Sequence, residues 1–142
     1  LLDGQVQTVH KDLCSINGIG PKIESFFLRD VAWCFGIRVV SHRDLLQPVD
    51  VWVERTVRQL DPAAKDRAAT WIVEASEAAG VSPEAVNAGV WYFGALIAGS
   101  EFRLFQALQD LQLGWRMVDE YVAGLQQQVD ARRREESLYA ES

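Results

Sequence analysis

The sequence has too few cysteines for a disulfide framework. Cys14 and Cys34 are the only two, and their positions show no metal-ligand spacing. Both lie on the apolar sides of expected helices, so we interpret them as buried thiols of an intracellular protein, in the cytoplasm, nucleoid or nucleus. No stretch is apolar for long enough to span a bilayer, and no signal-peptide pattern opens the chain. These absences exclude a disulfide-rich secreted domain and predict no membrane partner.

The alternation of apolar and polar residues that is typical of a half-buried strand is also missing. Apolar residues recur with helical spacing instead, and glycines and prolines separate the helical segments. The long connection "GIRVVSHRDLLQP" leaves room for one short extended piece at "IRVV". We therefore predict an all-α protein, a helical bundle, with helices near residues 4–14, 21–35, 50–60, 62–79, 83–98, 101–111 and 114–136.

The composition is that of a globular chain. Of the 142 residues, 49% are hydrophobic, and five are tryptophan. This length supports one helical domain over residues 1–142. Residues 1–60 carry seven basic and seven acidic side chains, so the whole net charge of −6 falls in residues 61–142. Overall acidity weakens the case for a nucleic-acid partner without excluding it, because the charge of the binding face governs affinity for phosphate.

The stretch "INGIGPKIES" predicts a tight hairpin between two helices, within residues 5–35. Gly18 and Gly20 permit backbone geometry that side chains obstruct, and Pro21 suits the first position of a helix. The entrance of the second helix then offers free backbone N–H groups, which bind anions and above all phosphate. Lys22 follows directly, and its simplest interpretation is a solvated lysine of the first turn.

A second helix start lies at "QPVDVWVERTVRQL", where residues 50–60 form an amphipathic helix with Val53, Val57 and Leu60 directed inward. Asp50 stands at its first position. Its simplest interpretation is an N-cap, whose carboxylate accepts backbone N–H bonds and favours the helix dipole.

Together, "INGIGPKIESFFL" and "PVDVWVERTVRQL" resemble the helix-hairpin-helix DNA glycosylase superfamily, the endonuclease III and 8-oxoguanine DNA glycosylase group. The first element matches that family's hairpin, and the second matches the Val-Asp pair that opens its catalytic helix. The matching positions are Ile16, Gly18, Ile19, Gly20 and Lys22 in the first element and Val49, Asp50, Val53 and Arg55 in the second.

The resemblance implies base-excision DNA repair by a bifunctional glycosylase and AP lyase acting on duplex DNA with a damaged base. Gly18, Ile19 and Gly20 would hold a DNA phosphate, and the damaged nucleotide would be flipped out of the stack. Lys22, as a free amine, would attack C1′ and form a Schiff base, while Asp50 would stabilise the cationic sugar. The lesion implied is an oxidised purine such as 8-oxoguanine.

A third element, "VNAGVWYFGALIAG", resembles a late helix that lines the base pocket in the 8-oxoguanine branch. It makes Asn87 and Trp91 candidates for the base pocket, and Trp52, beside Asp50, is another. Each of the two tryptophans has a second interpretation, as part of the hydrophobic core.

Several features depart from the family. Asn17 replaces the hairpin proline, and Glu24 puts an acidic group one turn from the expected phosphate site. The four-cysteine iron–sulfur motif is absent, so we expect no metal and no cofactor beyond a structural cation at the hairpin. The resemblance covers residues 5–100, and the chain opens at Leu1 with few residues before the hairpin. We therefore expect an upstream segment of the same protein to be missing, and residues 1–142 alone to have little activity.

Three functions remain open from the sequence. The first is the base-excision enzyme, and the second is a helix-hairpin-helix module that binds DNA without catalysis. The Lys22–Asp50 pair favours the first, because a pure binding module does not need an aspartate at that helix start. The third is a helical interaction domain that binds a protein partner through its acidic C-terminal half.

Overall fold

The structure, a computed structural model, describes residues 5–140, with side chains described to residue 136. Every regular element in that range is helical, and residues 5–140 contain no strand, which confirms the all-α prediction. No helix of the described residues is long and apolar enough to cross a bilayer. The chain divides into two compact units, Leu1–Tyr92 and Phe93–Ser142, where the sequence led us to expect one domain.

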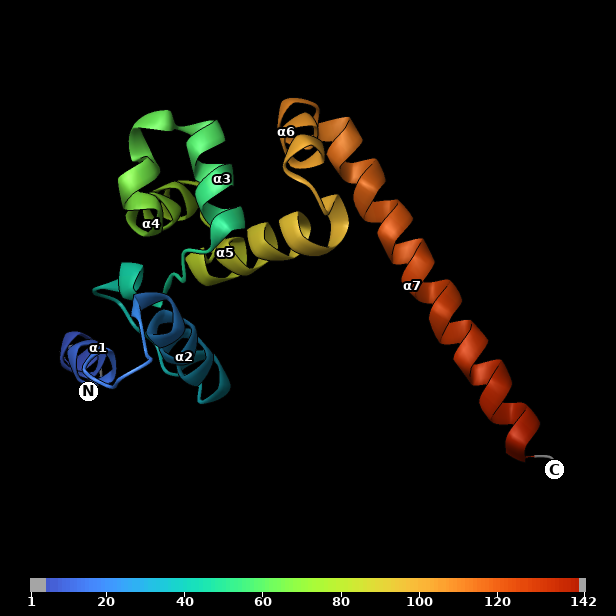
Figure 1. Cartoon of the computed structure of the whole chain (residues 1–142), viewed down its shortest axis with the longest axis horizontal. Coiled ribbons are helices and arrows are strands. Elements are labelled where there is room, and N and C mark those ends of the chain that lie inside the picture. The colour runs from blue at the N-terminus through green and yellow to red at the C-terminus, as the bar shows by residue number, and fades with distance from the viewer. Residues whose placement is uncertain (1–4, 141–142) are drawn as a thin grey trace. The chain divides into compact units, whose positions relative to one another are not determined.

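The first unit holds most of the elements (Figure 1). It contains α1 (Val6–Cys14), α2 (Pro21–Cys34), η2 (Arg43–Leu46), α3 (Val51–Leu60), η3 (Pro62–Arg67), α4 (Ala68–Ala78) and α5 (Pro83–Tyr92), of which η2 and η3 are short 3₁₀ helices. Residues 37–40, where an extended piece was possible, form no strand.

The core of this unit lies where α3, η3 and α4 meet. Its buried members are Val53, Val57, Ala64, Ala68 and Ile72, and partly buried side chains of Val49, Trp71, Val86 and Val90 pack around them. Val53 and Val57 are directed inward as predicted, because they lie one turn apart on one face of α3. Leu60 does not follow them, since 51% of it is exposed at the end of the helix.

Capping residues explain where several helices begin. Ser82 Oγ accepts a hydrogen bond from Ala85 N, and Pro83 opens α5 as its sequence predicts. In the second unit, Ser100 caps α6 (Glu101–Gln109) by accepting from Arg103 N. A π-helix, η4 (Phe93–Ala98), precedes α6.

The helix that ends the described chain starts earlier than predicted. We predicted that this helix begins at Gly114, but α7 (Leu111–Ala140) begins at Leu111. Asp110 makes the break, because its Oδ1 accepts from Gln112 N and Leu113 N at 3.0 and 3.2 Å. The packing of α7 on α6 does not require a glycine at position 114, since a Cβ there would lie 3.5 Å from the Ala107 carbonyl oxygen, an ordinary van der Waals distance.

Candidate functional site

The turn between α1 and α2 occupies residues 15–20. Hydrogen bonds from Ile16 N to Leu13 O and from Ile19 N to Ile16 O, both 3.0 Å, close it. Gly18 has a φ of +91°, a conformation that side chains rarely adopt, which explains a glycine at this position. The sequence therefore predicted both the turn and the residue that makes it possible.

The start of α2 has no side-chain cap. Gly20 is the N-cap residue, and its extended backbone (φ −92°, ψ 171°) needs no glycine. The first helical bond runs from Glu24 N to Gly20 O at 3.1 Å. The earlier N–H groups of the first turn, those of Lys22 and Ile23, have no partner inside the helix. Such groups point outward along the axis and attract anions.

Lys22 is exposed and borders an open cavity of about 460 Å³. Val49, the residue immediately before Asp50, lines the same cavity. The other lining residues come from four parts of the first unit: His10, Pro21, Ser25, Asp44, Leu45, Gln47 and Ala69. The two sequence elements singled out above therefore border one cavity, although they are separated by the whole of α2 and the connection after it.

Asp50 is the N-cap of α3. Its Oδ1 accepts hydrogen bonds from Trp52 N and Val53 N, both at 2.9 Å. The carboxylate is half-buried, and it lies at the positive end of the helix dipole. The N-cap interpretation is thus confirmed, and it fixes the carboxylate rigidly beside the residue that lines the cavity.

The segment that leads to Asp50 is anchored from behind. Asn87 of α5, 1% exposed, donates from Nδ2 to the Pro48 carbonyl at 3.2 Å. Gln47, also buried, donates from Nε2 to the Arg43 carbonyl at 3.1 Å. Asn87 was a candidate for the base pocket, but its amide faces the backbone of the chain in the interior. Its observed role is to hold the loop before Asp50.

The two candidate tryptophans lie apart from the cavity. Trp52 is half-buried, with the guanidinium of Arg55 5.4 Å from its ring centre. Trp91 is 38% exposed and meets Tyr92 edge to face, with 6.3 Å between the ring centres. Neither lines the cavity that Lys22 borders.

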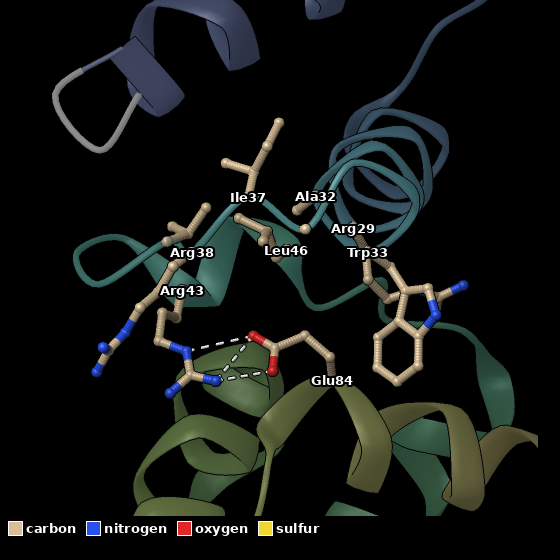
Figure 2. Close-up of a pocket in the computed structure, with 10 residues that line it drawn as sticks. Arg29, Ala32, Trp33, Ile37, Arg38, Arg43, Leu46 and Glu84 are labelled. Atoms are coloured by element: carbon tan, nitrogen blue, oxygen red, sulfur yellow. Dashed lines mark hydrogen bonds and ion pairs between the residues drawn. The ribbon is translucent and has the colours of Figure 1, made fainter. Parts of the chain in front are cut away.

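Arg43 ties the connection between α2 and α3 to the rest of the unit. Figure 2 shows its guanidinium facing the carboxylate of Glu84, beside a second cavity lined by Arg29, Trp33 and Arg38. Arg43 Nη2 lies 2.7 Å from Glu84 Oε2, and Nη1 lies 3.2 Å from Glu77 Oε1. Burial by itself raises the pKa of Glu84, but hydrogen bonds from Arg43 and Ser82 outweigh it, so the pKa is lowered overall.

We expect Glu84→Gln to lower the free energy of unfolding by about 1–2 kcal/mol at neutral pH, because it removes a charge-assisted bidentate contact. The lowered pKa means that this contribution is complete above the unfolded-state pKa, near 4.5, and is lost as the pH falls below it. Urea unfolding at pH 7 and below pH 4 measures both effects. Glu74→Gln is the control, since its exposed pair with Arg67 should change nothing measurable. Equal losses in the two variants would contradict the prediction.

The partly exposed His10 and the buried Glu24 form a pair that we did not predict from the sequence. Glu24 is 0% exposed, and its Oε2 lies 2.5 Å from His10 Nδ1 of α1. Glu24 lies one turn from the expected phosphate site along the chain, but its side chain lies in the interior against α1. Cys14, on the same side of α1, is half-buried, whereas Cys34 is exposed rather than buried as predicted. The sequence signal available for this cluster was the spacing of four residues between His10 and Cys14, which puts both side chains on one face of a helix.

Comparison of the chain with protein-family models, with curated proteins and with solved structures gives no match.

Proposed function

We propose that this chain carries the catalytic residues of a base-excision DNA glycosylase with AP lyase activity, acting on oxidised purines such as 8-oxoguanine. The observation that carries the proposal is that Lys22 and Val49, the residue immediately before Asp50, line one cavity. An amine that can form a Schiff base and a fixed carboxylate are the two groups that this chemistry needs.

The hairpin supplies the contact to DNA in this proposal. The uncapped first turn of α2 directs N–H groups outward, and Gly18 and Gly20 present no side chain to a strand that approaches them. A phosphate bound there lies within one helical turn of Lys22, because Gly20 and Lys22 are two residues apart. Residues 1–60, which contain the hairpin, have a neutral charge balance, so the hairpin segment itself carries no acidic excess.

Lys22 acts as the nucleophile. The target nucleotide is flipped out of the duplex so that C1′ becomes accessible. The free amine attacks C1′, the C1′–N bond breaks, and its electron pair leaves with the base, which takes up a proton. Ring opening gives the Schiff base, and loss of a proton from C2′ then expels the 3′ phosphate and cuts the strand. Lys22 is exposed in the free protein, so bound DNA must exclude water from the site before the attack.

Asp50 stabilises the positive charge that develops on the sugar as the base departs. Its two hydrogen bonds to the start of α3 hold the carboxylate in place before the reaction, so little reorganisation accompanies the charge development. Asn87 acts on Asp50 through the Pro48 carbonyl and is a positioning residue.

A binding module without catalysis is the second candidate. The observation that favours it is the cap itself, because two backbone hydrogen bonds are a sufficient reason for an aspartate at position 50. In that case Lys22 only contributes positive charge beside the hairpin.

Both candidate functions require the hairpin to contact DNA, so one substitution tests this contact for both of them. Gly20→Ala should weaken duplex binding without loss of helix content, because a Cβ meets nothing within 4 Å in the free protein and obstructs only a bound strand. Gly124→Ala, in α7, is the control with equally open space. Fluorescence anisotropy at low salt measures the affinities. Equal affinity of the two variants would show that the hairpin does not contact DNA.

The enzymatic proposal is tested with the protein and duplexes that contain 8-oxoguanine or an abasic site. Borohydride added during the reaction should trap a covalent protein–DNA adduct, and the strand should be cut at the lesion. An undamaged duplex of the same sequence should give neither product. Duplex binding with no adduct on any lesion would reject the enzyme in favour of the binding module.

A further inference from the structure

Three side chains with metal-binding atoms converge behind the hairpin. His10 and Cys14 lie one turn apart on α1, and Glu24 reaches them from α2. One ligand atom from each lies within 4.8 Å of the other two. His10 also lines the cavity that Lys22 borders, but the proposed DNA chemistry uses none of these three side chains.

The buried carboxylate of Glu24 is only partly satisfied. Its Oε2 meets His10 Nδ1 at 2.5 Å and the Ser25 hydroxyl at a distant 3.5 Å. Its Oε1 is buried and has no hydrogen-bond partner in the described part of the chain. A carboxylate that is 0% exposed is costly to bury unless both oxygens find partners. The free oxygen is therefore an observation that points to a missing ligand, separate from the proximity of the three residues.

We propose that His10, Cys14 and Glu24 bind one zinc ion. Nitrogen, thiolate and carboxylate donors suit a borderline cation such as Zn²⁺, whereas Ca²⁺ and Mg²⁺ take oxygen ligands. Neighbouring ligand atoms in a tetrahedral zinc site lie roughly 3.3–3.7 Å apart. The observed spread of up to 4.8 Å is wider than that range, so metal binding requires the three side chains to rotate toward one another. Binding releases the thiol proton of Cys14 to solvent, and a water molecule completes the fourth position.

The ion joins α1 to α2 across the turn that carries Gly18. Two ligands precede the turn and one follows it, so the metal closes a loop that includes residues 15–20. The site then stabilises the hairpin geometry, and it does so whether the hairpin binds DNA or not.

Cobalt is the probe for this site, because Co²⁺ occupies zinc sites and absorbs visibly when it has tetrahedral geometry. One Co²⁺ per chain should bind, with a thiolate-to-cobalt charge-transfer band, and Zn²⁺ should displace it. Cys14→Ser should abolish that band and lower the affinity by more than about 100-fold, which exceeds the loss caused by removing an outer-shell partner. Cys34→Ser is the matched control and should keep both the band and the affinity, because Cys34 is exposed and outside the cluster.

Alkylation of the two thiols gives an independent readout on the unaltered chain. Zn²⁺ should protect Cys14 from iodoacetamide while Cys34 reacts at an unchanged rate, as peptide mass spectrometry can show. Absence of Co²⁺ binding to the wild-type chain, or equal reactivity of Cys14 with and without Zn²⁺, would overturn the proposal. The His10–Glu24 contact would then be a plain ion pair.

Discussion

Lys22→Gln abolishes the borohydride-trapped adduct and the strand cut at an 8-oxoguanine or abasic lesion, if Lys22 is the nucleophile. A carboxamide cannot form a Schiff base, so no other property of the side chain can replace the amine. The change should leave the fold intact, because Lys22 is exposed at the second position of α2 and glutamine is a comparable helix former. Denaturing gels after borohydride treatment measure the adduct.

Lys11→Gln is the matched control for this experiment. Lys11 is an exposed lysine of α1 that does not line the cavity, so its loss removes the same charge at a different place. The adduct should form at the wild-type level in this variant. An adduct that survives Lys22→Gln, or one that disappears with Lys11→Gln, would show that the nucleophile has been misassigned.

Asp50→Asn should slow base release by about 10²–10³-fold while folding and duplex binding stay nearly unchanged. The carboxamide oxygen of asparagine can accept the same two bonds from Trp52 N and Val53 N, and asparagine is as good an N-cap as aspartate. Only the charge that opposes the sugar cation is lost, and a preorganised electrostatic contact of this kind contributes about 3–4 kcal/mol to the transition state. Single-turnover release of 8-oxoguanine measures the rate.

Asp61→Asn is the control for the loss of an acidic cap. Asp61 caps η3 through a 3.1 Å bond from Ala63 N, so the substitution repeats the chemical change at a second helix start. It should not alter base release. An equal decrease in both variants would assign the effect to net charge and remove Asp50 from the mechanism.

Local signals predicted most of the helix boundaries correctly. Ser82 with Pro83, Asp50, and Gly18 each act on the backbone within three residues, so their sequence neighbourhood is enough to assign their roles. The start of the last helix was misplaced at Gly114 because glycine and aspartate both interrupt helices in a sequence pattern. Only the hydrogen bond that Asp110 accepts shows that it is the residue that caps the helix. Leu60 was misassigned because periodicity does not show where a helix runs past the core.

Contacts between residues far apart in the chain could not be predicted from the sequence. Asn87 reaches the Pro48 carbonyl from 39 residues away, and Arg43 reaches Glu84 from 41. Nothing in the local pattern around Asn87 distinguishes a buried amide that binds backbone from one that binds a base. The contact between His10 and Glu24 was missed for a related reason. Histidine and glutamate side chains usually lie on the surface, and only the packing of α1 against α2 brings these two together.

The turn between α1 and α2 contains an asparagine that is prone to deamidation. Asn17 is exposed and is followed by Gly18, whose backbone N–H takes no part in the turn's hydrogen bonds from Ile16 and Ile19 within the described residues. A glycine offers the least hindrance when its backbone nitrogen attacks the preceding carboxamide carbon and ammonia leaves. The resulting succinimide opens to aspartate or isoaspartate, which adds a negative charge beside the proposed phosphate site. Storage at alkaline pH should therefore produce a more acidic form of the protein whose hairpin repels DNA.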